Sequence, residues 1–191
     1  IGGIDETSTQ KAIEFYKHFV IGTLHPTNAK TAEMVKLVEN ASRDNQIAFA
    51  NELSIICDKA GINVWEMIAL ANKHPRVNIL NPGTGVGGHC IAVDPWFIVS
   101  EFPEESPLIK KSRETNTYKT EWVIEKIKNK SLAFKIENKR DPIIACMGLA
   151  FKPDIDDLRE SPALLVTKRL ISNDFEILAV EPNIKEHTEF D

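Results

Sequence analysis

The chain has 191 residues, 42% of them hydrophobic, and a net charge of -5, which is ordinary for a globular protein with a real core. The acidic balance and the scattered cations give no reason to expect a nucleic-acid partner, and no apolar run approaches the roughly 20 residues of a membrane-spanning helix. Three cysteines without CxxC spacing argue against a disulfide framework and favour a reducing cytoplasm.

The N-terminal segment predicts a helix over residues 8–21, where Ile13, Tyr16 and Val20 recur near helical spacing. The residues before it have neither the basic start nor the long apolar stretch of a signal peptide. Because the chain begins with Ile1 rather than Met, we expect the natural chain to begin earlier.

A long helix is predicted over residues 29–60, and Gly61 suits a left-handed C-terminal cap. At about 1.5 Å per residue it would be roughly 48 Å long, which is typical of a scaffold for other domains or a dimer interface. Its apolar residues form one predicted stripe: Met34, Leu37, Val38, Ala41 and Ala48.

Two further helices are predicted in the middle of the chain. Asn63 can cap a short helix that ends before His74 and the proline after it. Ser106 followed by proline is a favourable helix start, and the apolar pattern then runs as far as Ile127, with room for a break near Asn116.

The C-terminal part has a different pattern of polar and apolar residues. Residues 135–142 are polar and are predicted to be a linker. Strands over 143–149 and 175–180, with a helix opened by Ser161 between them, predict a βαβ unit. Two parallel strands do not complete a doubly wound sheet, so we expect this domain to be cut short. The predicted fold class is a mainly α central domain with a long helix, followed by the start of a parallel α/β (Rossmann-like) domain.

A glycine-rich loop at residues 81–95 carries the candidate chemistry. It contains a GxGxxG pattern from Gly83 to Gly88, but Asp94 and its following proline come too soon for the helix that a dinucleotide-binding loop requires. The glycines instead let backbone amides approach a ligand closely. Cys90 follows them, and a thiol in an amide-rich turn is stabilised as the nucleophilic thiolate. The alternative is a cysteine buried in a tight turn.

Polar residues before the loop are further candidates. Lys36, Asn40 and Arg43 are spaced to share one helix face, away from the apolar stripe. Their ammonium, carboxamide and guanidinium groups would suit a polyoxygenated ligand, whereas the alternative is a solvated polar stripe. His74 and Arg76 offer more donors in the segment that leads to the loop.

Three ordered motifs resemble the UDP-glucose/GDP-mannose dehydrogenase family. They are GGHCIAVDP at residues 87–95, Lys36 with Asn40, and GLAFKPDIDDLRESP at residues 148–162. The histidine directly before the cysteine makes the chain most similar to the UDP-N-acetyl-D-mannosamine dehydrogenase branch. The resemblance implies an N-terminal NAD-binding domain, a central helical domain and a C-terminal domain that binds the nucleotide sugar.

The same resemblance implies the division of this chain. Residues 1–28 would be the tail of the NAD-binding domain, 29–135 a central helical domain that forms a homodimer, and 140–191 the beginning of the UDP-sugar-binding domain. Because the NAD fingerprint lies outside these segments, we expect the 191-residue chain to be inactive alone.

The family reaction oxidises the C6 alcohol of a sugar to a carboxylate with two NAD⁺. The resemblance implies that Cys90 forms a thiohemiacetal and then a thioester, that Lys36 stabilises oxyanion charge or relays a proton, and that Asp94 orients water or assists the lysine. Contacts with the UDP-sugar are implied for Asn40, Arg43, His74, Arg76, Gly87 and Lys152, and a contact with NAD is implied for Arg159.

Other interpretations stay open. A metal site could combine His89, Cys90 and Asp94 with His74, but the spacing does not favour one, and we expect no metal. The chain alone could be a non-catalytic dimerisation module, because a long helix is a natural twofold interface. Within the family, the sugar could also be UDP-glucose, UDP-N-acetylglucosamine or UDP-N-acetylgalactosamine.

Overall fold

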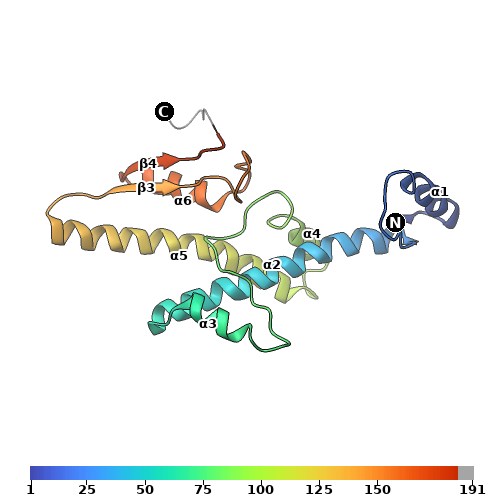
Figure 1. Cartoon of the computed structure of the whole chain (residues 1–191), viewed down its shortest axis with the longest axis horizontal. Helices are drawn as coiled ribbons and strands as arrows, with labels where there is room; N and C mark the ends of the chain where they lie inside the picture. Colours follow the sequence, from blue (N-terminus) through green and yellow to red (C-terminus); the bar gives the residue numbers. More distant parts are fainter. Residues whose placement is uncertain (185–191) are drawn as a thin grey trace.

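Two long helices that cross near the middle of the molecule organise the chain (Figure 1). The computed structural model describes residues 1–184. Helices α2 (Ala29–Ala60) and α5 (Pro107–Asn138) have 32 residues each, and α4 (Asp94–Glu101) packs against both of them. Within the described residues, no helix combines the length and the apolar character needed to cross a bilayer.

The ends of α2 are set by local signals and confirm the prediction. The Asn28 side chain accepts a hydrogen bond from the Thr31 amide at 2.9 Å, which satisfies one of the free amides of the first turn. Gly61 ends the helix at φ 69°, a left-handed conformation that glycine adopts without a steric penalty.

The predicted single stripe of α2 was wrong, because its members lie on two faces. Ala41 and Ala48 are buried on the side that packs against α5, where small side chains let the helix axes come close. Met34 and Val38 are exposed. Helix–helix packing therefore uses the alanines, and the larger apolar residues remain on the outer face.

The N-terminal helix is shorter than predicted. Helix α1 (Glu6–Tyr16) begins after the cap Asp5 and ends five residues before the predicted residue 21. The chain must reverse there, because β2 (Thr27–Asn28) pairs in parallel with β1 (Gly2–Gly3). Apolar spacing alone did not reveal this return.

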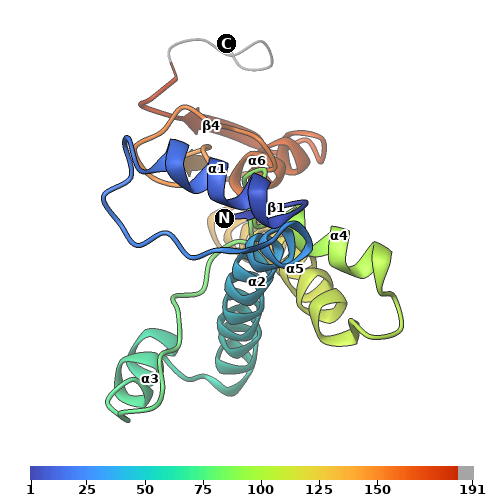
Figure 2. The same ribbon diagram turned by 90° about the vertical axis from the view of Figure 1, so that its right-hand side faces the viewer.

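Helix α3 (Val64–Ala71) follows α2. The segment after it, residues 72–80, is closed by two hydrogen bonds between the Asn72 side chain and the Ile79 backbone, at 2.9 and 2.7 Å. Helix α3 and this segment lie on the opposite side of α2 from α4 (Figures 1 and 2).

Helix α5 is continuous where a break was expected, and it extends to Asn138 into the predicted linker. Asn116 does not interrupt the helix because its side chain bonds to α2 rather than to its own backbone. The helix ends at Lys139, which has φ 55°. The connection to the next strand is therefore shorter than residues 135–142.

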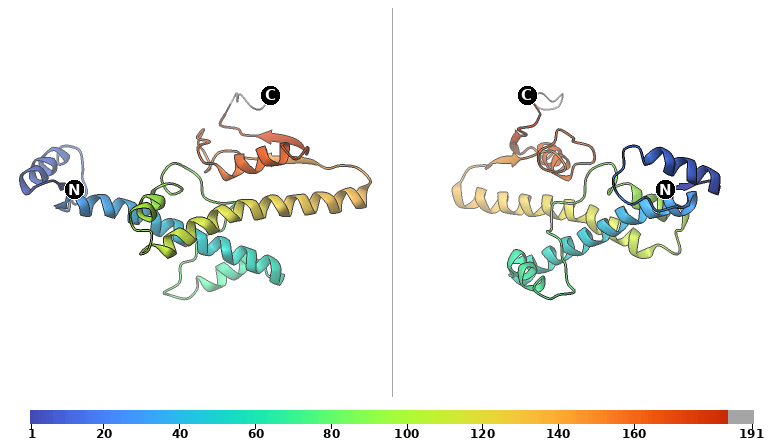
Figure 3. Two further views of the ribbon diagram at one scale, coloured as in Figure 1. Left: turned by 180° about the vertical axis from the view of Figure 1, so that it is seen from behind. Right: turned by 45° about the vertical axis from the view of Figure 1, so that its right-hand side comes forward.

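The C-terminal unit is the predicted βαβ unit. Strands β3 (Ile143–Met147) and β4 (Glu176–Val180) are parallel, and α6 (Pro162–Ile171) connects them. The core joins Ile124 of α5 to Val166 and Leu170 of α6. Partly buried side chains of both strands complete this core, so the unit packs along α5 (Figure 3). The predicted fold class is confirmed.

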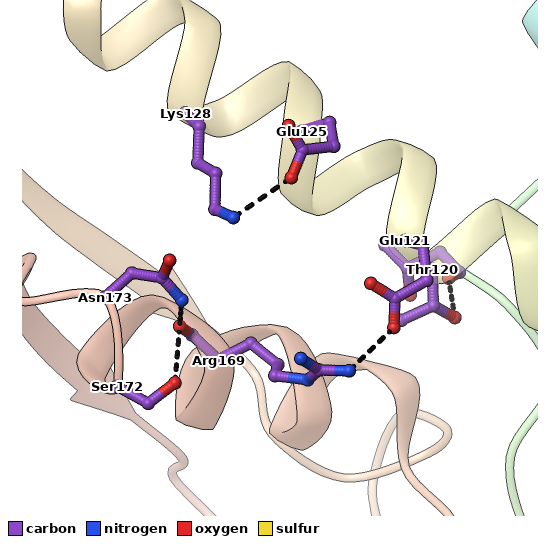
Figure 4. A network of polar contacts seen from close by, with 8 residues as sticks. Thr120, Glu121, Glu125, Lys128, Arg169, Ser172 and Asn173 are labelled. Carbon is purple, nitrogen blue, oxygen red and sulfur yellow. Dashed lines mark hydrogen bonds and ion pairs between the residues drawn. The ribbon is translucent and has the colours of Figure 1, made fainter.

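Polar contacts also hold α6 against α5. A guanidinium nitrogen of Arg169 lies 3.2 Å from a carboxylate oxygen of Glu121 (Figure 4). The Arg169 carbonyl accepts bonds from Ser172 and Asn173 at 2.9 and 2.6 Å, which closes the end of α6. The C-terminal unit thus has a defined position relative to the helices that carry the glycine loop.

Candidate active site

The glycine loop, residues 82–93, is held at its entrance by both long helices. The Gly83 amide donates to Oδ1 of Asn51 on α2 at 2.8 Å. The hydroxyl of Thr120 on α5 donates to the Thr84 carbonyl at 2.7 Å. The two bonds satisfy loop backbone groups that secondary structure does not pair, so the loop leaves the helix crossing in a fixed direction.

A buried polar network supports this entrance. Asp44 on α2 is fully buried and lies 2.5 Å from the Arg113 guanidinium on α5. Asn116 donates to Oδ1 and to the carbonyl of Asp44, at 2.8 and 3.1 Å, and accepts a bond from Asn51 at 2.9 Å. Burial raises the pKa of Asp44, although Arg113 and Asn116 oppose that shift. The network therefore ties the helix crossing to Asn51 and, through it, to the loop.

The end of the loop is held by α2 as well. The Cys90 carbonyl accepts bonds from the amides of Val93 and Asp94 at 3.1 and 2.8 Å, and α4 begins at Asp94. This short helix was not predicted. The side-chain carboxamide of Asn40 donates through Nδ2 to Oδ2 of Asp94 at 2.5 Å, across 54 positions of sequence. Two of the candidate residues are therefore in direct contact next to Cys90.

The predicted row of donors on α2 is partly buried and partly exposed to solvent. Asn40 is buried because α4 covers it, which corrects the expectation that the whole row faces away from the packed side. Lys36 lies one turn before it, with its side chain 64% exposed and Nζ 3.7 Å from Glu39. Arg43 is also exposed. Exposed Lys36 and Arg43 thus flank a buried amide that holds Asp94.

The glycines after the entrance contact the C-terminal unit. The Gly88 amide donates to the Arg159 carbonyl at 3.0 Å, and Gly88 has φ 82°. A Cβ on Gly87 would lie 2.6 Å from the Glu160 carbonyl oxygen and 2.7 Å from Cβ of Phe151. Only glycine allows such an approach. The segment between β3 and α6 is therefore seated directly on the loop that presents Cys90.

Arg159 and Asp157 form the charged part of that segment. The guanidinium donates to both carboxylate oxygens, with Nε at 2.9 Å from Oδ1 and Nη2 at 2.6 Å from Oδ2. These bonds lower the pKa of Asp157 to about 2, and the nearby His89 contributes in the same direction. The pKa of Arg159 is raised mainly by Asp157 and also by Cys90. The C-terminal unit thus places a cation near the candidate nucleophile.

Three implied substrate contacts belong to segments outside the loop. Lys152 is exposed, with Nζ 5.7 Å from the ring centroid of Phe151, the residue that packs on Gly88. His74 accepts a bond from the Arg76 amide at 3.3 Å in the segment after α3. That segment lies across α2 from α4 in the same chain (Figure 2). One chain therefore brings Lys152 near the loop but keeps His74 and Arg76 away from it.

The surroundings of the three cysteines separate Cys90 from the others. Cys57 is buried in α2, and Cys146 is partly buried against the core of the C-terminal unit. Cys90 is partly exposed in the loop. Among the residues that the structure describes, no three His, Cys, Asp or Glu side chains gather as metal ligands would.

The GxGxxG pattern does not have the geometry of a pyrophosphate site. A Cβ on Gly85 would lie 2.4 Å from the Thr120 hydroxyl, and the faces of Gly87 and Gly88 are covered by residues of the C-terminal unit. The helix after the loop has only eight residues. The one NAD contact that the resemblance implies, Arg159, has an exposed guanidinium, a group that suits an anionic cofactor.

Sequence reasoning missed the buried network and the carboxylate that orients Arg159. A signal existed for part of it: Asp44 and Asn51 are seven residues apart, on the face that also carries Ala41 and Ala48. Polar residues within a row of small buried ones indicate a bonded partner. No local pattern in the sequence identified Asp157 as the residue to which Arg159 bonds.

Comparison with protein families gives two matches. Residues 30–118 match the central domain of the UDP-glucose/GDP-mannose dehydrogenase family. Residues 145–191 match the UDP-binding domain of the same family. The first match ends within α5 and the second begins within β3, so one falls on the crossed helices and the other on the C-terminal unit.

Curated and solved relatives agree with these matches. The chain is 61% identical over 187 residues to a UDP-N-acetyl-D-mannosamine dehydrogenase of Campylobacter jejuni, covering 97% of the chain and 45% of the relative. It is 54% identical to an NDP-N-acetyl-D-galactosaminuronic acid dehydrogenase of Ralstonia solanacearum, covering 97% and 43%. A UDP-N-acetyl-mannosamine dehydrogenase from S. aureus superposes with a TM-score of 0.85 at 43% identity, covering 97% and 44%. The chain thus spans about half the length of the relatives it matches.

Proposed function

This chain belongs to the UDP-glucose/GDP-mannose dehydrogenase family, and we propose that it supplies the nucleophile and the sugar-binding surface of an NAD-dependent nucleotide-sugar 6-dehydrogenase. The observation that carries the proposal is the loop of Cys90. Asn40 and Asp94 bond to each other at its end, and the segment of the UDP-binding domain is seated on Gly87 and Gly88. A sugar between these two parts would meet a partly exposed thiol.

The chemistry that we propose follows from the residue types. Loss of a hydride and a proton from the C6 alcohol gives the aldehyde. The Cys90 sulfur then adds to the aldehyde carbon, and the carbonyl oxygen takes a proton to give a thiohemiacetal. Loss of a hydride and that proton gives a thioester, which water cleaves to the carboxylate and the free thiol. NAD⁺, when bound, supplies the hydride acceptor for both oxidations. A covalent adduct keeps the aldehyde from escaping between the two steps.

The other residues have supporting roles in this proposal. The Lys36 ammonium stabilises the negative charge that develops on the oxygen, or relays its proton. Asp94, whose orientation Asn40 sets, orients the attacking water. Arg43 and Lys152 contact the nucleotide sugar from the two sides of the loop.

UDP-N-acetyl-D-mannosamine is the substrate that we propose first, because the 61% identical relative bears that name. The 54% identical Ralstonia relative, named for an N-acetyl-D-galactosaminuronic acid, supports a UDP-N-acetylgalactosamine alternative. A chimera that carries this chain, assayed for product formation with each of these sugars and with UDP-glucose, would rank the candidate substrates.

The test uses a chimera in which residues 1–191 replace the matching segment of the Campylobacter jejuni relative. Cys90→Ser should abolish uronate formation far more than UDP-sugar binding, since serine keeps the shape of the site but is a poor nucleophile. Lys36→Ala should lower the rate by roughly 10²–10³-fold, as for the loss of one preorganised charge. Cys146→Ser, which changes a thiol in β3, is the matched control and should keep full activity.

The proposal fails if the Cys90→Ser chimera still completes both oxidations at the parent rate. The 191-residue chain alone, mixed with NAD⁺ and UDP-N-acetyl-D-mannosamine, is expected to form no NADH, because its only GxGxxG loop is covered by the C-terminal unit. If the chimera is inactive with every UDP-sugar while the chain still dimerises, a non-catalytic dimerisation module replaces the proposed enzyme.

A further inference from the structure

A pocket of about 620 Å³ lies between α2, α5 and the entrance of the glycine loop, a volume within the range of small-molecule sites in proteins. Its α2 wall is formed by Ser54 and Asp58, one turn apart. These two residues are on the face turned to α5, because Lys119 and Lys126 of α5 bond to them. The exposed Ile56 points the other way along the helix circumference, so the pocket does not use the outer face of α2.

Lys119 places an ammonium group in the wall of this pocket. The residue is only 4% exposed, and its Nζ donates to the Ser54 hydroxyl at 2.7 Å and lies 4.0 Å from the ring centroid of Trp122. No carboxylate in the described part of the chain is within 4.0 Å of this Nζ. Because an ammonium has three donors and buried donors are normally bonded, Lys119 is suited to an acceptor that a ligand brings.

The charges around the pocket favour a ligand with a single negative charge. The Asp58 carboxylate is bonded to the Lys126 ammonium at 2.5 Å, and that ammonium lies 5.4 Å from the centroid of the same Trp122 ring. Residues 62–65 and 82–84, which form the other walls, bring no charged side chain. Two lysines and one aspartate leave one net positive charge, which a monoanion balances and a dianion exceeds.

The rest of the wall is apolar and aromatic. Trp122 and Val123 contribute from α5, and Ile62, Val64 and Trp65 contribute from the start of α3 and the turn before it. Ile62 and Trp65 are 53% and 57% exposed, so apolar surface remains there for a ligand to cover. Indole faces of this kind suit a flat ring.

We propose that this pocket binds a small organic monoanion with a flat apolar body, an aromatic carboxylate, whose oxygens accept from Lys119 and whose ring packs on Trp65 and Trp122. Binding is reversible, and no covalent bond forms. None of the candidate catalytic or sugar-binding residues lines the pocket, so this site goes beyond the proposed function. Its occupant would contact Gly83 and Thr84, where the loop that presents Cys90 begins.

The experiment is isothermal titration calorimetry of the 191-residue chain at pH 7 with 2-naphthoate and with 2-naphthamide, which has the same ring but no charge. The parent should bind naphthoate at least about 10-fold more tightly, as expected for a hydrogen bond to a buried charge. Lys119→Met should bind the two compounds equally. Lys130→Met, at an exposed position of the same helix, is the matched control and should keep the preference of the parent.

Two further arms test the charge itself. Burial lowers the pKa of Lys119 to about 8, so the affinity for naphthoate should fall between pH 7 and pH 9.5 as the cation is lost, whereas the affinity for naphthamide should stay constant. Asp58→Asn removes the negative charge beside the pocket and should tighten naphthoate binding about 2–5-fold. This partly exposed position covers the case in which Lys119→Met does not fold.

Three results would each overturn the inference: no saturable binding of naphthoate, equal affinities of the parent for naphthoate and naphthamide, or inorganic phosphate bound as tightly as naphthoate. The last result would mean that the lysines attract anions without any recognition of an apolar body. None of these measurements depends on dehydrogenase activity, so the proposed function and this inference can fail separately.

Discussion

Gly83 and Gly87 are four residues apart in one loop but have different surroundings. A Cβ on Gly83 would meet only the Gly85 carbonyl, at 3.8 Å, whereas a Cβ on Gly87 would lie within 2.8 Å of three atoms of the C-terminal unit. Gly87→Ala must therefore push the segment of Glu160 away from the loop. Overpacking of this kind typically costs about 1–3 kcal/mol.

Urea denaturation should accordingly show a loss of roughly 1–3 kcal/mol in the free energy of unfolding for Gly87→Ala. Gly83→Ala should be neutral or should stabilise by up to about 1 kcal/mol, since its backbone is not in the left-handed region. Equal effects of the two alanines would show that the loop and the C-terminal unit do not pack as described.

Lys119 on α5 has an unusual environment for a lysine. It is buried, donates to the Ser54 hydroxyl at 2.7 Å and lies 4.0 Å from the ring centroid of Trp122. Burial lowers its pKa to about 8, against the opposing charge of Asp58. Between pH 8 and about 10.5, the unfolded chain binds a proton that the folded chain does not, so the free energy of unfolding rises with pH in this window.

Chemical denaturation of the parent and of Lys119→Met from pH 7.5 to 10.5 tests this sign. The parent should gain roughly 1–2 kcal/mol relative to the variant, less than the whole pKa shift would give, because Lys119 lines a surface pocket with Asp58 and Trp122 that is open to water. Lys130→Met, at an exposed position of the same helix, should follow the parent. A constant difference between parent and Lys119→Met across the range would contradict the lowered pKa.

The crossing of α2 and α5 depends on the pair of Asp44 and Arg113. Both side chains are nearly inaccessible, at 0% and 6% exposure, so Arg113→Met would leave a buried carboxylate without its cation. Removal of one partner of a buried pair typically costs about 3–5 kcal/mol. The loop entrance should loosen as well, because Asn116 and Asn51 continue the same network.

Thermal and urea unfolding of Arg113→Met should show a loss of about 3–5 kcal/mol. Lys111→Met, which breaks the exposed pair with Glu114, should cost less than about 1 kcal/mol. The double variant Asp44→Asn with Arg113→Met should recover part of the loss, since no buried charge remains. A single variant as stable as the parent would mean that the pair does not hold the crossing.

Elements were predictable where their signals are local. The cap Gly61 gave the end of α2, and Ser161 gave the start of α6. Helix α4 was missed because Val93 provides no side-chain cap, and its start depends on the turn at Cys90 and on Asn40. The break expected near Asn116 was wrong because a polar residue inside a helix looks the same whether it ends the helix or bonds to a neighbour.

The outer face of α2 carries exposed apolar side chains in its first turns and in its second half. Val35, Val38, Phe49 and Ile56 are exposed, and their spacing in multiples of about 3.5 residues puts them on one side of the helix. Such a row supports our proposal that two copies of the chain pair through α2, since a twofold interface uses the same patch on both copies.

Sedimentation at high protein concentration should give a dimer for the parent and a monomer for Phe49→Asp. The control is Leu132→Asp on α5, because Phe49 and Leu132 are similarly exposed, at 53% and 58%. The control should remain a dimer. A monomeric parent, or dissociation by both substitutions, would count against α2 as the interface.

The dimer would also account for His74 and Arg76, which lie across α2 from the glycine loop within one chain. If they contact the sugar, they do so at the loop of the second copy. In the chimera, a mixture of Arg76→Ala and Cys90→Ser should then regain activity that neither variant has alone, because one of the two mixed sites carries both native residues. Lack of recovery in mixed dimers would remove His74 and Arg76 from the substrate contacts.

The order of residues along the chain was enough to indicate a nucleophilic cysteine in a glycine loop and the main helices and strands around it. The Cys90 loop, the long helix with its caps and the βαβ unit depend on neighbours in sequence, such as a glycine that permits a turn or a serine that caps a helix. The pairing of Asn40 with Asp94, the seating of Arg159 on Gly88 and the buried network depend on segments that approach only after folding. A polar side chain has the same local pattern whether it is solvated or bonded across the molecule, and only the packing of distant helices distinguishes the two.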